Sequence, residues 1–93
     1  MTDFGIERMF RHEDGFYVAE CVSYYTQEKF IAHDRWGSWM ANRNPWTRED
    51  IENGPWSDLP HRFAAVLQDR KLTMEKGIAK IADNPFVALG GAA

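Results

Sequence analysis

Three histidines and one cysteine are the residues whose chemistry could support catalysis or metal binding. His12, His33 and His61 do not repeat at a ligand spacing such as His-x-x-x-His, and no pair of cysteines accompanies them. Cys21 lies inside a stretch of alternating residues, whereas nucleophilic cysteines more often sit where an element ends and the thiolate is stabilised. We therefore predict no metal site, no cofactor and no catalytic residue, and we expect a protein that is not an enzyme.

The tryptophans are the most distinctive group in the sequence. All four lie between residues 36 and 56, in a stretch that also holds several carboxylates. Tryptophan is enriched at the centres of protein interfaces, and carboxylates suit a partner with a basic surface. We predict that residues 34–58 contact a protein partner, with packing in the core or at helix starts as the alternative role of the tryptophans. The predicted contact residues are Asp34, Trp36, Trp39, Trp46, Glu49, Asp50, Glu52, Trp56 and Asp58.

The two parts of the chain differ in charge. Residues 1–60 hold six Lys or Arg and eleven Asp or Glu, giving −5, whereas residues 61–93 hold five and three, giving +2. Phosphate binding needs a basic surface, so we do not expect direct nucleic-acid binding. The alternative function is a small nucleic-acid-binding regulator that uses the basic residues of a helix expected at 58–83. These residues are Arg62, Arg70, Lys71, Lys76 and Lys80.

Occlusion of a partner's surface is the function that we expect from this pattern. Small acidic proteins are common among phage and mobile-element inhibitors, including anti-CRISPR proteins, and this chain is similar to them in size and charge. The similarity is one of class, without a shared motif. It implies a viral inhibitor or regulator whose partner has a basic groove meant for nucleic acid.

Length and composition point to one folded domain. The chain has 93 residues, of which 44% are hydrophobic and 27% charged, which is ordinary for a globular protein. A single cysteine cannot form an intramolecular disulfide, and neither a signal peptide nor an apolar run of membrane-spanning length is visible. We expect a cytoplasmic protein without membrane contact, and its oligomeric state stays open.

A β-hairpin is predicted at the start of the chain. Residues 4–10 and 16–25 alternate between apolar and polar types, and a three-residue loop at 13–15 would place Gly15 in the left-handed conformation. This loop sets the register, because a shift by one residue would turn a whole strand over. The predicted pairs are Phe10 with Val18, Arg8 with Glu20, Ile6 with Val22, and Phe4 with Tyr24.

The next element is less clear from its pattern. Residues 29–36 favour a third strand, which would complete a meander over 4–36, with the start of a helix as the alternative. The Trp- and Pro-rich connection at 37–57 contains one short helix at 48–53. Thr47 and Asp50 approximate a capping box at its start, and Trp46 and Ile51 have the spacing of a hydrophobic staple. The Gly54-Pro55 pair is expected to end the helix.

The main helix is predicted at 58–83, with Ser57 as its N-cap and a tail at 84–93. A straight helix of that length would exceed the size of such a domain, so we expect it either to break near Thr73 or, as the alternative, to extend beyond the sheet. The fold class is therefore α+β. It consists of a two- or three-stranded antiparallel meander packed by a long or broken amphipathic helix. Apolar residues at helical spacing support the helix, namely Leu59, Phe63, Val66, Leu67, Met74, Ile78 and Ile81.

Overall fold

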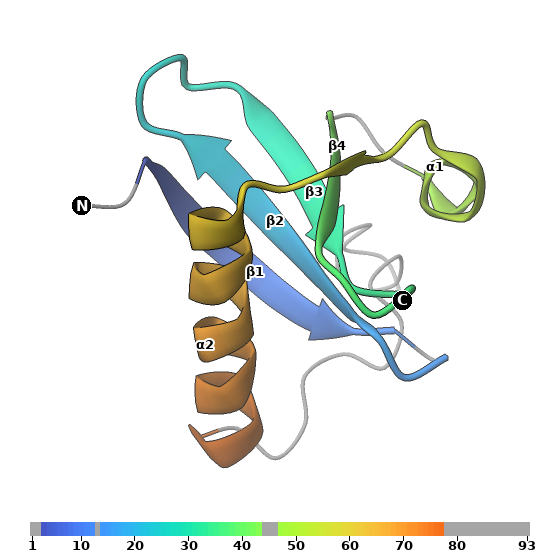
Figure 1. Cartoon of the computed structure of the whole chain (residues 1–93), viewed down its shortest axis with the longest axis vertical. Coiled ribbons are helices and arrows are strands. Elements are labelled where there is room, and N and C mark those ends of the chain that lie inside the picture. The colour runs from blue at the N-terminus through green and yellow to red at the C-terminus, as the bar shows by residue number, and fades with distance from the viewer. Residues whose placement is uncertain (1–2, 13, 44–46, 78–93) are drawn as a thin grey trace, which may run out of the picture.

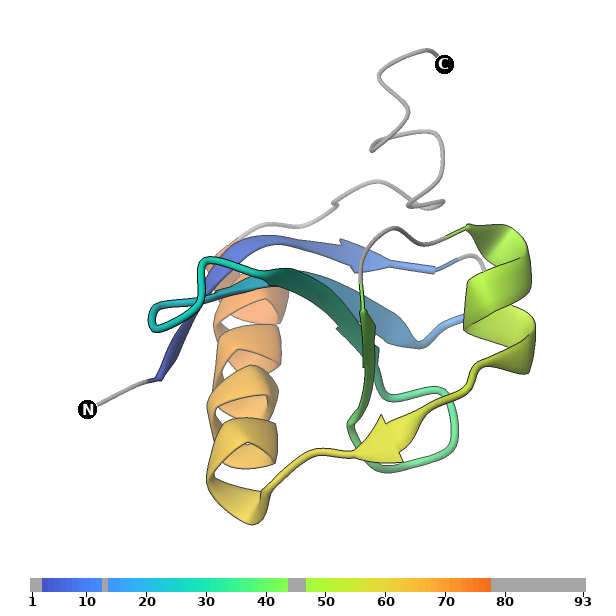
Figure 2. The same cartoon turned by 90° about the horizontal axis from the view of Figure 1, so that it is seen from above.

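Five strands and two helices make up the part of the chain that the structure describes. The computed structural model describes residues 3–12, 14–43 and 47–77. The elements are β1 (Phe4–Arg11), β2 (Tyr17–Ser23), β3 (Lys29–His33), β4 (Met40–Arg43), α1 (Arg48–Asn53), β5 (Ser57–Asp58) and α2 (His61–Gly77). The strands form one antiparallel sheet in the order β1-β2-β3-β4-β5. Its α2 side curves around that helix, and α1 lies beyond the far side (Figures 1 and 2). The α+β class is confirmed.

The first hairpin closes as its loop residues predict. Gly15 has φ +97°, a left-handed conformation that costs glycine little. The His12 N–H donates to the Phe16 carbonyl at 2.8 Å, and the Gly15 N–H donates to the His12 carbonyl at 2.8 Å. The predicted pairs of Phe10 with Val18 and Arg8 with Glu20 are confirmed.

A β-bulge makes the other half of the predicted register wrong. Between Ile6 and Arg8 the register shifts by one, so that Ile6 pairs with Cys21 and Phe4 with Ser23. The extra residue, Glu7, reverses the alternation along β1. Phe4 and Ile6 therefore join Met9 in the core against α2, and Arg8 lies on the opposite face.

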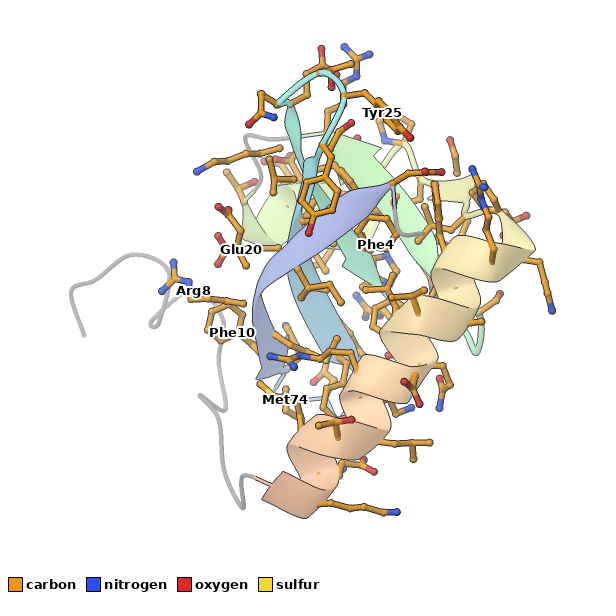
Figure 3. The ribbon with its side chains drawn as sticks, turned by 90° about the vertical axis from the view of Figure 1, so that its left-hand side faces the viewer. Phe4, Arg8, Phe10, Glu20, Tyr25 and Met74 are labelled. Atoms are coloured by element: carbon orange, nitrogen blue, oxygen red, sulfur yellow. The ribbon has the colours of Figure 1, made fainter. Side chains whose placement is uncertain are left out.

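Figure 3 shows where the bulge leaves the charged pair of Arg8 and Glu20. Arg8, Phe10 and Glu20 lie on the side of β1 away from α2, whereas Phe4 lies toward the helix. The Arg8 Nε donates to Glu20 Oε2 at 3.0 Å, as a cross-strand pair would. In an unbroken strand the even spacing of Phe4, Ile6 and Phe10 would predict one shared face for all three, which is wrong here because the bulge separates Phe10 from the other two.

The meander is longer than predicted. Residues 29–33 form the third strand, and the following residues 34–36 belong to the turn. The connection at 37–57 contains the unpredicted strand β4 and the first residue of the unpredicted strand β5. β4 has the sequence Met-Ala-Asn-Arg, which has little strand propensity, so its conformation depends on pairing with β3. The predicted sheet of two or three strands is therefore smaller than the sheet of five strands in the described residues.

The short helix α1 matches its predicted bounds. The Thr47 side chain accepts from the Asp50 N–H at 3.2 Å, and Asp50 Oδ2 accepts from the Thr47 N–H at 2.8 Å. Gly54 follows as the C-cap residue, with its N–H donating to the Asp50 carbonyl. Ile51 is buried, while Trp46, its predicted staple partner, lies outside the described residues.

The main helix begins later than predicted. Ser57 is not its N-cap, because Ser57 and Asp58 pair with β4 instead. The helix starts at His61, after Pro60, whose carbonyl accepts from the Ala64 N–H at 3.0 Å. No break occurs near Thr73, since α2 is continuous from His61 to Gly77. That length is about 26 Å at 1.5 Å per residue, which fits such a domain. Residues 78–93, including the predicted helix end and tail, lie outside the described residues.

The two faces of the sheet bury separate clusters. Between the sheet and α2, Met9, Tyr17, Cys21, Trp39 and Leu67 are among the buried residues. On the α1 side, a smaller cluster contains Phe16, Val18, Ile31 and Ile51, with Trp56 packed against it.

Candidate functional site

The turn between β3 and β4 is fixed by Asp34. Its carboxylate accepts from the Tyr17 backbone N–H at 2.7 Å and from the Lys71 Nζ at 3.1 Å. The Asp34 N–H also donates to the Tyr17 carbonyl at 3.2 Å. The Asp34 side chain is only 11% exposed, so it holds the turn against β2 and α2 instead of facing a partner.

Tyr17 extends this attachment further along α2. Its hydroxyl donates to Glu75 Oε1 at 2.7 Å, and the Lys71 Nζ lies 5.2 Å from the centre of its ring. Burial and the bond to Glu75 raise the pKa of Tyr17 to about 12, so the phenol keeps its proton at neutral pH. Two turns of the helix are thus bound to the sheet beneath the turn.

Trp36 is the exposed tryptophan of this turn. Its side chain is 53% exposed, yet its ring meets the His33 ring edge-on with centroids 4.9 Å apart. Trp56 meets the same His33 ring at 4.2 Å and 84°. His33 therefore connects the turn to the segment between α1 and β5.

His33 itself is completely buried. Its Nδ1 accepts from the Arg35 N–H at 3.0 Å, which leaves the proton of the neutral ring on Nε2. Within the described part of the chain, that buried Nε2 has no hydrogen-bond partner. Burial lowers the pKa of His33 to about 4, against the attraction of Asp34, so the ring is neutral at physiological pH. A neutral buried ring suits packing better than proton transfer.

His12 extends the aromatic contacts from the turn to the hairpin loop. The His12 ring stacks on Phe16 with centroids 4.3 Å apart and an angle of 13°. Its Nδ1 accepts from the Asp14 N–H at 3.1 Å. Phe16 in turn lies 5.8 Å from His33, so the hairpin loop and the turn share one aromatic cluster, defined here as His12, Phe16, His33, Trp36 and Trp56.

The predicted contact residues separate into buried and exposed groups. Trp39 is 4% exposed and belongs to the core against α2, and Trp56 is half-buried against the α1-side cluster. Asp50 completes the capping box, and Trp46 lies outside the described residues. The exposed members are Trp36, Glu49, Glu52 and Asp58, which we call the Trp36 surface. They come from three parts of the chain, namely the turn, α1 and β5.

The basic residues of α2 do not form a free cationic face. Arg62 bonds to Asp3, and Lys71 bonds to Asp34. Arg70 and Lys76 are exposed, with Asp69 and Glu75 on the same helix, and Lys80 lies outside the described residues. This arrangement offers phosphate fewer cations than the sequence pattern implied.

Groups with catalytic chemistry are few in the described residues. Cys21 is fully buried, and burial raises the pKa of its thiol to about 12, so it is not a thiolate at neutral pH. Residues 3–12, 14–43 and 47–77 contain no group of three or more His, Cys, Asp or Glu side chains placed to hold a metal ion. Neither described helix is long and apolar enough to cross a membrane.

Sequence reasoning missed the part played by His33 and Tyr17. The alternation along β3 places His33 on the face of Ile31, which was a signal that it would be buried. No comparable signal indicates the bond from Tyr17 to Glu75, because 58 residues separate them.

Comparison of the chain with protein-family models, with curated proteins and with solved structures gave no match.

Proposed function

We propose that the protein is a non-enzymatic protein-binding module that acts by covering a partner's surface. The observation that carries the proposal is Trp36, which is exposed although its ring is held against the buried His33. An exposed aromatic side chain that is already fixed loses little entropy on binding, which is why such residues act as anchors in interfaces.

The acidic members of the Trp36 surface suggest the chemistry of the partner. Glu49, Glu52 and Asp58 are exposed, and no described lysine or arginine bonds to any of them. We propose a partner with a basic surface, of the kind that binds nucleic acid, in the cytoplasm of a bacterial or other host cell. Association would then slow as salt rises. An inhibitory role like that of anti-CRISPR proteins enters by analogy of size and charge.

A capture experiment tests the proposal. Immobilised wild-type protein, Trp36→Ala and Leu72→Ala are exposed to an extract of the native host, and the retained proteins are identified by mass spectrometry. Leu72 is the matched control because it is an exposed apolar residue on α2, away from the Trp36 surface. The purified partner is then titrated by calorimetry.

We expect Trp36→Ala to weaken binding by about thirtyfold, the loss typical of a central anchor, and Leu72→Ala to have no effect. Equal affinity of wild type and Trp36→Ala would reject the Trp36 surface. Tight binding of DNA or RNA in a gel shift at low salt would instead favour the nucleic-acid-binding alternative, which the paired Arg62 and Lys71 do not support.

A further inference from the structure

A hollow lies at the end of β3 and β4 that is opposite the turn with Trp36, on the α2 side of the sheet. It has a volume of about 480 Å³ and is lined mainly by apolar side chains, including Phe30, Ala41, Leu59 and Phe63. Phe30 begins the paired part of β3 that His33 ends, so the two sites are about 10 Å apart along the strand at 3.3 Å per residue. We call this hollow the β4–α2 groove.

The groove opens beside an incomplete strand pair. β5 pairs with β4 only at Met40 and Ala41, and no described strand continues that pairing at Asn42 and Arg43. The Arg43 N–H is bonded to the exposed side chain oxygen of Asn42 at 2.8 Å. A peptide carbonyl can replace that oxygen, so this edge can accept an extended peptide whose side chains alternate toward the groove.

One exposed arginine lies at the rim of the groove. Arg43 lines it with a side chain 82% exposed, and its guanidinium lies 3.8 Å from the exposed carboxylate of Glu28, an exposed pair that a peptide carboxylate can replace. Acidic groups beside an apolar side chain would complement both the rim and the hollow.

We propose that the β4–α2 groove binds an extended peptide in which a large apolar residue has acidic neighbours. The apolar side chain occupies the space between Phe30 and Phe63, and a neighbouring carboxylate meets Arg43. This site is separate from the Trp36 surface, so the protein can hold two partners at once.

Titration of the full chain by NMR tests this proposal. The probe is the blocked peptide acetyl-Asp-Leu-Asp-Phe-Asp-Gly-amide, and the control peptide has lysine in place of each aspartate. We expect amide shifts at Ala41, Arg43 and Phe63 with a Kd near about 1 mM or tighter for the acidic peptide. The lysine peptide is expected to leave these amides unchanged.

Three variants sharpen the result. Arg43→Glu should weaken binding by at least about tenfold, whereas Arg70→Glu, a charge reversal at an exposed arginine further along α2, should not. Ser57→Trp, at an exposed position lining the groove, should block it. Trp36→Ala should bind the peptide like wild type.

The proposal is overturned if the acidic peptide causes no shifts in the groove, or if the lysine peptide binds equally well. It is also overturned if Arg43→Glu and Arg70→Glu weaken binding alike, because that would indicate only general attraction between charges. A negative result with the peptide would not count against the proposed role of the Trp36 surface, because that role is tested with a different variant and a different ligand.

Discussion

The two ends of β3 and β4 contact the rest of the molecule in different ways. At the Trp36 end, Asp34 bonds to both Tyr17 and Lys71, and the buried His33 ring contacts an exposed tryptophan. At the groove end, apolar side chains surround an open hollow, and Arg43 pairs with Glu28 at the surface. One end presents an exposed tryptophan ring packed on a buried histidine, and the other presents a mainly apolar recess.

This difference separates stability from binding. A polar group that is buried and bonded is costly to disturb, whereas an exposed ion pair contributes little. Changes at the Trp36 end should therefore unfold the protein more readily than changes at the groove end. The predictions below follow that order, from the largest expected loss of stability to the smallest.

Removal of the buried Trp39 ring is expected to have the largest effect. Trp39→Ala should lower the free energy of unfolding by about 3–5 kcal/mol, because it leaves a large cavity between the sheet and α2. Urea unfolding followed by circular dichroism measures the loss. Phe30→Ala is the control at the groove end, where the ring is only half-buried. An equal loss for the two variants would remove the contrast between the ends.

The buried His33 makes stability at this end depend on pH. Its pKa is about 4 in the fold and 6.5 ordinarily, so the unfolded chain takes up a proton first as the pH falls. The free energy of unfolding should therefore fall between about pH 6.5 and pH 4, by at most about 3 kcal/mol, and this contribution is fully present above pH 6.5. Urea unfolding across this range measures the slope.

His33→Gln isolates that contribution, because the carboxylates that also titrate near pH 4 are common to both proteins. Desolvation is the main cause of the shift; Asp34 opposes it, and Arg35 and His12 reinforce it. The variant should be less dependent on pH than wild type over the same window. If the free energy of unfolding had the same pH dependence in both proteins, His33 would take up its proton as readily in the folded protein as in the unfolded chain, with the aromatic cluster intact.

Local signals predicted the features that depend on neighbouring residues. Gly15 fixed the hairpin loop, and Thr47 with Asp50 fixed α1, because each effect acts within four residues. The bulge at Glu7, the pairing of β4 and β5, and the start of α2 depend on contacts between distant segments, so the sequence pattern did not reveal them.

The same limit applies to the candidate site. Trp36 and Trp39 are three residues apart and of one type, yet one is exposed and the other is in the core. Composition predicted a tryptophan-rich contact surface, but only the path of the chain through the turn decides which ring faces solvent. Asp34 was expected to face a partner because it is an acid in the tryptophan-rich stretch. Its bonds to Tyr17 and Lys71 join residues 17 and 37 positions apart in the sequence, so the local pattern did not indicate them.

Loss of the Asp34 carboxylate should have an intermediate effect. Asp34→Ala leaves the Tyr17 N–H without its acceptor and Lys71 without its partner, and should cost about 2 kcal/mol. Asp34→Asn keeps an oxygen for the N–H and should cost less. Urea unfolding gives both values, and hydrogen exchange at residues 34–37 reports whether the turn has loosened. Equal costs for the two variants would assign the effect to charge alone.

Arg43→Gln at the groove end should have the smallest effect on stability. The Arg43–Glu28 pair is exposed on both sides, so its loss should change the free energy of unfolding by less than about 0.5 kcal/mol. The same change should weaken binding of the acidic peptide, because it removes a cation from the rim. Glu28→Gln is the matched change, since it breaks the same pair but frees Arg43, and should bind the peptide at least as well as wild type. If Glu28→Gln weakened binding as much as Arg43→Gln, the intact pair rather than the arginine charge would matter, and the rim would not recognise carboxylates.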